Sequence, residues 1–92
     1  SQPVIGRTTI KGLLDNLFSP YPAVSEGRLT VTGEDATVDD RGATPIALLF
    51  HELATNAVKY GALSAETGRV DIAIRHDGDE IILRWTETGG PE

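Results

Sequence analysis

Apolar residues recur with two different periods along the chain, and residues 8–18 are the first stretch with a helical period. Their apolar side chains return every three or four positions, which is typical of a helix with one buried face. Thr8 or Thr9 offers a hydroxyl that can cap the start of this helix. The two prolines of SPYP at 19–22 should end it, because proline cannot continue a helix.

A second helical period covers the middle of the chain. Thr44 followed by Pro45 is typical of a helix start, since a hydroxyl residue caps well and proline is favoured at the first helical position. The helix should run to about Tyr60, where Gly61 stops it. On a helical wheel, apolar residues fall in an arc of about 100° that we expect to face the core: Ile46, Leu49, Phe50, Leu53, Ala57 and Tyr60.

Strict alternation of apolar and polar residues predicts strands elsewhere. Residues 28–32 have the pattern of a half-buried strand, and 36–38 are expected to return beside them after a turn, giving a short hairpin. Residues 69–76 and 80–86 also alternate, and the turn sequence DGD joins them. This arrangement predicts a second, longer hairpin.

The order of these elements is helix, two short strands, helix and two long strands. That order indicates an α+β fold with antiparallel strands and helices on one face. Ninety-two residues fit one small domain or part of a larger one. The final TGGPE has no closing element after it, so we expect a loop that has been cut through.

Charge and composition narrow the classes of function. The net charge is −6, with 14 acidic against 8 basic residues, so no nucleic-acid partner is expected, because such proteins carry a basic face. The chain has no cysteine, which excludes disulfides and thiolate metal sites. No apolar run approaches the roughly 20 residues of a membrane span and no signal peptide opens the chain, so we expect a cytoplasmic domain without membrane contact.

Three polar residues line one edge of the second helix. Glu52, Asn56 and Lys59 stand at positions i, i+4 and i+7, which places them in an arc of about 60°. A solvated helix edge would have the same spacing. However, asparagine is a poor helix residue, and an amide oxygen, an ammonium group and a carboxylate suit Mg²⁺, phosphate and proton transfer respectively.

A glycine pair follows the last strand in the sequence WTETGGP. Glu87 precedes Gly89 and Gly90. Glycines let a flat ligand approach the backbone closely, and a carboxylate can accept a hydrogen bond from an exocyclic amine such as that of adenine. The alternative is an ordinary glycine turn at a strand end, with Trp85 as a core residue.

The two motifs HELATNAVKYGALS and WTETGGP together resemble the ATP-binding domain of the HWE family of bacterial sensor histidine kinases. The first would be the N box, at residues 50–64, and the second the first glycine box, at residues 85–91. The letters that name the family stand here as His51, Trp85 and Glu87. The resemblance extends over most of the chain.

This resemblance implies a Bergerat (GHKL-type) fold. Such a fold is a two-layer sandwich in which helices back a mixed, largely antiparallel sheet and ATP lies between them. Residues 1–92 would be a single partial catalytic and ATP-binding domain. It would be incomplete at its C-terminus, because the second glycine box and the ATP lid are expected after Pro91.

The resemblance also implies roles for the N-box residues. Asn56 would coordinate Mg²⁺, and Lys59 would contact the phosphates of ATP. Tyr60 would line the nucleotide pocket. Glu52 occupies the acidic position of the N box, where the resemblance implies a catalytic, polarising group near the triphosphate.

In the glycine box, the resemblance implies that Glu87 reads the adenine amine and that Gly89 and Gly90 shape the adenine pocket. His51 and Trp85 are family hallmarks without an assigned role. We expect a structural role for Trp85, since a single indole at a strand end is more often core than ligand.

By the same resemblance, the whole protein would be a histidine protein kinase that transfers the γ-phosphoryl group of ATP to a histidine outside this chain. The phosphoryl group would then pass to the receiver domain of a response regulator. A homodimer would form through other segments, and this fragment alone would be inactive. Neither His51 nor His76 is expected to be the phosphoacceptor. Two alternatives stay open: a nucleotide-binding regulatory or interaction module without kinase activity, and a structural domain whose helix edge is merely solvated.

Overall fold

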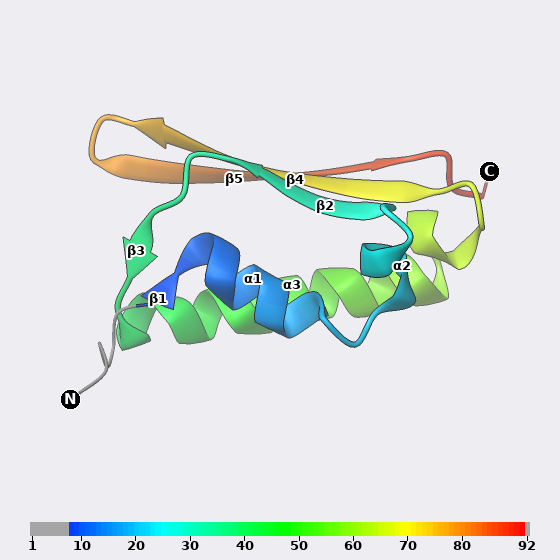
Figure 1. The fold of residues 1–92 in the computed structure, drawn as a ribbon, viewed down its shortest axis with the longest axis horizontal. Coiled ribbons are helices and arrows are strands. Elements are labelled where there is room, and N and C mark those ends of the chain that lie inside the picture. The colour runs from blue at the N-terminus through cyan, green and yellow to red at the C-terminus, as the bar shows by residue number, and fades with distance from the viewer. Residues whose placement is uncertain (1–7, 92) are drawn as a thin grey trace.

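The computed structural model describes residues 8–91 and forms two layers, a three-stranded sheet and a layer of helices (Figure 1). The elements in chain order are β1 (Thr8–Thr9), α1 (Ile10–Phe18), α2 (Pro22–Ser25), β2 (Leu29–Gly33), β3 (Thr37–Val38), α3 (Asp40–Lys59), the 3-10 helix η1 (Ala62–Ser64), β4 (Arg69–Asp77) and β5 (Glu80–Thr88). The α+β two-layer architecture predicted from the sequence is therefore confirmed. Within residues 8–91, no helix combines the length and the apolar character needed to cross a bilayer.

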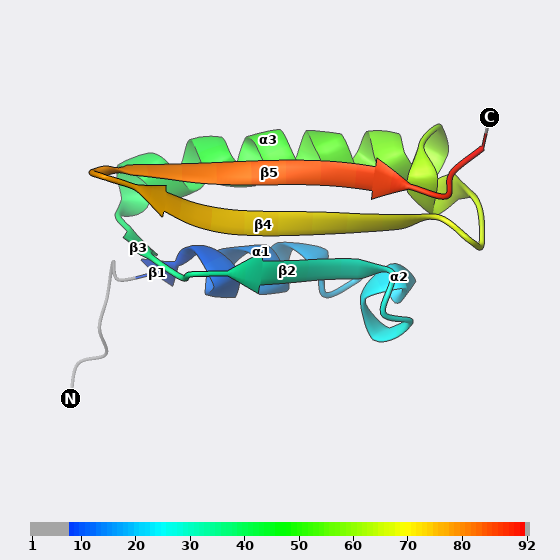
Figure 2. The same cartoon turned by 90° about the horizontal axis from the view of Figure 1, so that it is seen from above.

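The sheet is mixed, with β4 at its centre. β2 runs parallel to β4 on one side, and β5 runs antiparallel to it on the other. Seen from above, α1 and α3 lie behind the sheet, and the opposite sheet face is open (Figure 2). The register places Val31, Ile72 and Trp85 side by side on the face toward the helices.

The core lies between the two layers. Both helices and the central strand contribute to it, because β4 turns alternate side chains toward the helices. The buried apolar residues are Ile10, Leu14, Phe18, Ala23, Leu29, Phe50, Ala54, Ala57, Ala62, Leu63, Val70, Ile72 and Ile74. Among the described residues, no polar or charged side chain is buried with them.

The start of α1 confirms the cap predicted there. Thr9 is the N-cap, and its Oγ1 accepts a hydrogen bond from the Gly12 backbone N–H at 3.0 Å. Asp35 adds a second acceptor from far along the chain, because its Oδ1 accepts from the Lys11 N–H at 2.9 Å. These contacts satisfy backbone donors that the first helical turn would leave unpaired.

The long hairpin is also confirmed. β4 and β5 pair from Arg69 opposite Thr88 to Asp77 opposite Glu80, so Gly78 and Asp79 form a two-residue turn. The small elements α2 and η1 are additions that the apolar pattern did not predict.

The short hairpin predicted over residues 28–38 is wrong. β2 pairs in parallel with β4, and β3 pairs instead with β1, as Thr8 opposite Val38. The β2 strand has a long apolar neighbour in β4 to pair with, whereas the two residues of β3 offer very little. The prediction failed because it paired segments that are close in sequence.

The predicted start of the second helix is also wrong. α3 begins at Asp40, and the side chain of Asp39 caps it by accepting from the Gly42 N–H at 3.0 Å. Pro45 lies inside the helix, on an exposed position. A strong carboxylate cap and the acidic Asp40 in the first turn favour the earlier start, despite the donor that the proline lacks.

The buried face of α3 is rotated from the predicted arc. Phe50 and Ala57 are buried as expected, and Ile46 and Leu53 pack partly buried against the core. Leu49 and Tyr60 were expected there, but they are 56% and 76% exposed, and Ala54 is fully buried instead. A small alanine lets the helix lie close to the sheet layer, which turns the larger side chains at the margin toward solvent.

Candidate functional site

The two predicted motifs meet at one end of the molecule. The C-terminal ends of α3 and β5 lie at the same end, on the right in Figure 1. The Gly61 N–H donates to the carbonyl oxygens of Asn56 and Ala57 at 3.1 and 3.0 Å, which closes the helix. The next N–H, of Ala62, donates to Glu87 Oε1 at 2.8 Å. Ala62 and Glu87 are 25 positions apart in the sequence, and the fold brings them into contact.

A hollow of about 210 Å³ opens at this junction. It is lined by Gly61, Ala62, Glu87, Thr88, Gly89, Gly90 and Pro91. The three glycine-box residues predicted to hold adenine therefore all line one hollow. We refer to it as the glycine hollow.

This wall has no room for a side chain at Gly61 or at Gly89. A Cβ atom at Gly61 would lie 2.5 Å from Glu87 Oε1 and 3.1 Å from the Ala57 Cα, so any side chain there would displace the carboxylate. Gly89 has a φ of 69°, which other residues rarely adopt. A Cβ there would also lie 2.6 Å from the Thr67 carbonyl oxygen. These glycines bring the loop after α3 and the end of β5 into direct contact.

Glu87 is held at both oxygens yet remains exposed. Its Oε1 accepts from the Ala62 N–H, and its Oε2 accepts from the Trp85 indole Nε1–H, each at 2.8 Å. An ionised carboxylate offers about four acceptor positions, so acceptor capacity remains for a ligand in the glycine hollow. The role of Ala62 was not predictable from the sequence, because a backbone amide leaves no signal in side-chain chemistry.

The polar edge of α3 is exposed, as a ligand-binding edge or a solvated edge would be. Within residues 8–91, the side chains of Glu52, Asn56 and Lys59 form no hydrogen bond or ion pair. Tyr60 adds a largely exposed ring just before Gly61. The described part of the chain also contains no group of three or more His, Cys, Asp or Glu side chains placed to hold a metal.

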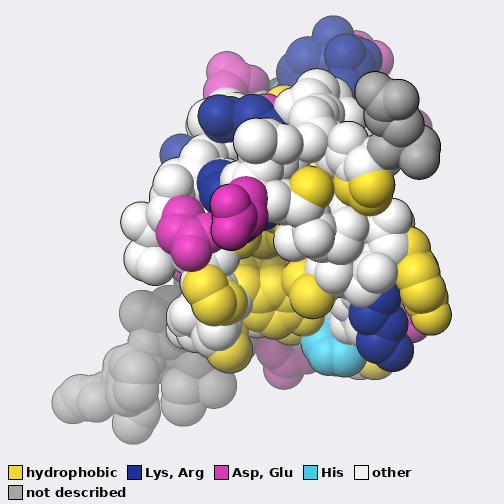
Figure 3. Space-filling model, turned by 90° about the vertical axis from the view of Figure 1, so that its right-hand side faces the viewer, with side chains coloured by type: hydrophobic (Ala, Val, Ile, Leu, Met, Phe, Trp, Pro, Cys, Tyr) yellow, Lys and Arg dark blue, Asp and Glu magenta, His cyan; other side chains and the backbone are white. Residues whose placement is uncertain are grey.

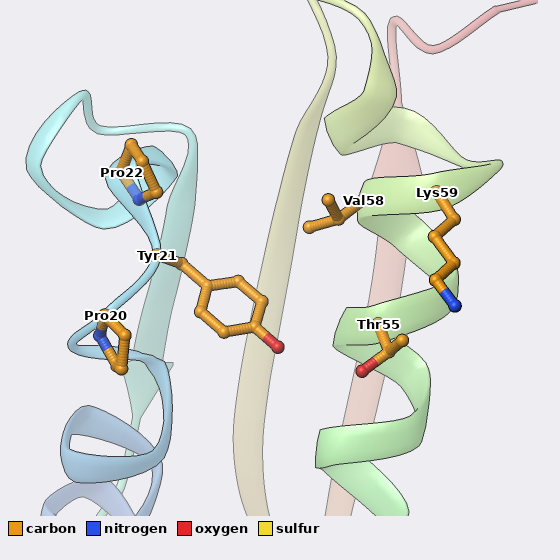
Figure 4. A pocket seen from close by; sticks show the side chains of 6 residues that line it. All are labelled: Pro20, Tyr21, Pro22, Thr55, Val58 and Lys59. Atoms are coloured by element: carbon orange, nitrogen blue, oxygen red, sulfur yellow. The ribbon is translucent and has the colours of Figure 1, made fainter.

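A second hollow, of about 300 Å³, lies between the loop after α1 and the outer side of α3. Its lining residues are Pro20, Tyr21, Pro22, Thr55, Val58 and Lys59 (Figure 4). Hydrophobic side chains gather in a hollow at this end of the molecule (Figure 3). Lys59 therefore stands at the border between an apolar hollow and the polar edge of α3.

The two histidines lie apart from the glycine hollow. His51 is exposed on α3, and its backbone carbonyl accepts from Thr55 Oγ1 at 2.8 Å. His76 lies near the far end of β4, with Nε2 at 3.2 Å from the Asp35 carbonyl oxygen.

Arg28 is a second residue near the site that was not predicted from the sequence. Its guanidinium group donates to the carbonyl oxygens of Gly68, at 2.9 Å from Nε, and of Ala65. The same group pairs with Glu26 at 2.8 Å. Thr67, between the two carbonyls, donates from Oγ1 to the Gly89 carbonyl oxygen at 3.1 Å. Arg28 thus anchors the loop that supports the back of the glycine hollow.

The chain is similar in sequence to several known bacterial proteins. No protein-family model matches it. Over 82 residues, or 89% of the chain, it is 42% identical to blue-light-activated histidine kinase 1 of Erythrobacter litoralis. The chain is related to histidine kinases. It is also 39% and 41% identical to proteins named blue-light-activated histidine kinase from Brucella anthropi and Brucella ovis, over 91% of its length in each case.

These histidine kinases are much longer than the chain. The aligned region covers 23% of the Erythrobacter protein and 18% of each Brucella protein. The chain thus corresponds to about a fifth of each relative. The aligned stretch includes about nine-tenths of the chain.

Proposed function

We propose that this chain is the ATP-binding part of a sensor histidine kinase of the HWE family, with a Bergerat (GHKL-type) fold. The observation that carries the proposal is the Glu87 carboxylate, which two donors hold over a glycine-lined hollow. The similarity to proteins named histidine kinases supports the same function.

The glycine hollow would receive the adenine base. Glu87 presents only acceptor atoms when ionised, so it suits an exocyclic amine and disfavours a carbonyl oxygen at the same place. The backbones of Gly61, Gly89 and Gly90 leave part of the wall without side chains, which lets a flat ring approach closely. The hollow of about 210 Å³ lies just after the C-terminal end of α3, because Gly61 and Ala62 line it.

The polar edge of α3 would hold the metal and the phosphates. Asn56 has an exposed amide whose oxygen is a hard ligand suited to Mg²⁺. An octahedral Mg²⁺ usually takes one or two protein ligands and keeps several waters and phosphate oxygens, so a nucleotide-bound Mg²⁺ does not need a cluster of carboxylates. Mg²⁺ would neutralise the charge that develops on the transferred phosphoryl group. Lys59 would contact phosphate oxygens as a point charge, and Tyr60 would line the nucleotide pocket.

In the whole protein, the γ-phosphoryl group of ATP would pass to a histidine of a helical domain outside this chain. Glu52, one turn before Asn56 on the same edge, would keep that imidazole basic and act as the catalytic carboxylate. The phosphorylated histidine would then supply the receiver domain of a response regulator, and a homodimer would form through further segments.

The test of this function uses Asn56→Ala in the full kinase. We expect autophosphorylation with Mg²⁺ and labelled ATP to be lost, because the protein ligand of the metal is gone. Asn16→Ala is the matched control, since it makes the same change at an exposed position of α1 and should leave autophosphorylation intact. Normal autophosphorylation of the Asn56 variant would reject the proposal.

Calorimetry with ATP and Mg²⁺ separates the structural alternative from the two nucleotide-binding ones, and phosphohistidine labelling then separates the kinase from the regulatory module. A kinase should both bind the nucleotide and label a histidine, whereas a regulatory module would bind without labelling. A structural domain with a solvated helix edge would do neither.

A further inference from the structure

The W-x-E spacing places Trp85 and Glu87 on the same side of β5. Alternate residues of a strand point to the same face. Here Trp85 lies opposite Ile72 and Glu87 lies opposite Val70, and both partners are buried toward the helices. The indole Nε1 and Glu87 Oε2 are 2.8 Å apart. The spacing of two therefore puts the donor next to the carboxylate.

The indole is itself fixed by the core. Its ring centroid is 5.8 Å from that of Phe50 on α3 and 6.5 Å from that of Phe18 on α1. The contact with Phe18 is edge-on, at an interplanar angle of 63°. Both phenylalanines are buried. Rings packed in this way hold one another in a defined orientation, so the core sets the direction of the indole N–H.

The carboxylate has one donor for each oxygen. The Ala62 backbone N–H holds Oε1, and the indole N–H holds Oε2. Neither donor can accept a hydrogen bond in exchange, because a backbone N–H and an indole N–H only donate. The plane of the carboxylate is therefore determined, and its remaining acceptor positions stay available at the glycine hollow.

We infer that Trp85 is a positioning residue for nucleotide recognition, which acts through Glu87. The indole N–H orients the Glu87 carboxylate before the ligand arrives. The base therefore meets a fixed acceptor, which favours a base with a hydrogen-bond donor at the matching position. This inference rests on the proposed function of Glu87 as the adenine acceptor. Trp85 thereby strengthens the preference for a purine with an exocyclic amine over a purine with a carbonyl oxygen at that position.

The first test needs no nucleotide and uses the 92-residue chain. Trp85 is the only tryptophan, so the chain gives a single indole N–H signal in an ¹H–¹⁵N correlation spectrum. Glu87→Ala should shift this signal and speed its exchange with water, because the acceptor is lost. Thr86→Ala, on the opposite face of the same strand, is the control and should leave the signal in place. An unchanged indole signal in the Glu87 variant would overturn the contact.

The second test measures selectivity in the full kinase with Mg²⁺. The probes are ATP and inosine triphosphate, which carries a carbonyl oxygen in place of the exocyclic amine. Trp85→Phe keeps an aromatic ring but removes the donor. We expect its preference for ATP over inosine triphosphate to fall by about three- to tenfold, the range for one hydrogen bond, through weaker ATP binding with little change for the inosine nucleotide.

A second variant removes the donor while preserving the shape of the side chain. Replacing Trp85 site-specifically with benzothienylalanine, by suppression of a stop codon at that position, puts a sulfur atom in the place of the N–H. It should lower the selectivity as Trp85→Phe does, even if the smaller phenylalanine disturbs folding. Equal selectivity in the wild type and in this variant would overturn the inference and leave the proposed function intact. A wild-type kinase without any preference for ATP would overturn both.

Discussion

The two faces of α3 differ in almost every physical respect. The inward face carries Phe50, Ala54 and Ala57, all buried, and contributes no polar side chain to the core. The outward face carries Glu52 and Asn56, both exposed, among other polar and apolar side chains. The residues that stabilise the fold and the residues proposed to bind the ligand thus lie on opposite sides of one helix. Substitutions on the two faces should therefore have separable effects.

Phe50→Ala on the inward face should have the largest effect. Phe50 is 2% exposed, and its ring packs against Trp85 at a centroid distance of 5.8 Å. Truncation leaves a cavity between the layers and should lower the free energy of unfolding by about 3–5 kcal/mol. Urea unfolding followed by circular dichroism measures the loss. A loss below about 1 kcal/mol would mean that the inward face does not hold the layers together.

Ala54→Leu should come next, because it adds volume where the helix lies closest to the core. Ala54 is fully buried, and an added isobutyl group must displace its neighbours. We expect a loss of about 1–3 kcal/mol of unfolding free energy. Stabilisation in the same urea experiment would show that an unfilled space exists beside Ala54.

Asp39→Ala tests a position that belongs to neither face. The carboxylate accepts from the Gly42 N–H at the start of α3, and its removal should cost about 1 kcal/mol. Asp39→Asn serves as the control, since asparagine caps nearly as well. Equal losses for both variants would show that the side-chain acceptor is not what stabilises this end.

Leu49→Ala and Asn56→Ala probe the outward face. Both side chains are exposed, so each variant should change the unfolding free energy by less than about 0.5 kcal/mol. The same urea titration provides the measurement. If Leu49→Ala lowered the unfolding free energy as much as Phe50→Ala does, the helix orientation predicted from the sequence would be correct.

A small effect that depends on pH is expected on the open face of the sheet. The Arg69 guanidinium, 2.8 Å away, and then the Thr30 hydroxyl hold the pKa of Asp71 below its usual value of 3.8. A lowered pKa in the folded state contributes stability above the ordinary carboxyl pKa, and this contribution is lost as the pH falls through the folded value.

Asp71→Asn should therefore lower stability slightly at neutral pH, by less than about 1 kcal/mol, because the pair is exposed. The difference between the variant and the wild type should shrink as the pH is lowered below 3.8. Unfolding free energies measured across this pH range provide the check. A difference that grows on acidification would contradict the assigned sign.

Local patterns in the sequence correctly predicted the features that depend on residues close together in the chain. The Thr9 cap and the hairpin from Arg69 to Thr88 depend on neighbours along the chain, and both are confirmed. The partner of β2 depends on β4, which follows only after the whole of α3. Periodicity within β2 carries no information about that partner.

The orientation of α3 shows a second limit. A helical wheel gives the angles between residues but not which direction faces the sheet. Large residues such as Leu49 and Tyr60 looked more suitable for the core than Ala54, yet the close approach of the two layers favours the small side chain.

The candidate site was predictable only in part. Glu87, Gly89 and Gly90 were identified and do line one hollow. The donors that hold Glu87 were not foreseen, because one is the backbone N–H of Ala62 and the other is an indole expected to be purely structural. The metal and phosphate roles of Asn56 and Lys59 stay predictions.

The parallel pairing of β2 with β4 also constrains the order in which the chain can fold. The β4–β5 hairpin closes through a two-residue turn, whereas Thr30 must find Asp71, 41 positions later. Closing that longer loop costs more entropy and slows folding. On a ribosome, β2 and both helices would emerge before their central partner strand exists. Their apolar faces must therefore remain uncovered until residues 69–88 have been synthesised, which makes this interval the one in which the nascent chain is most exposed to aggregation.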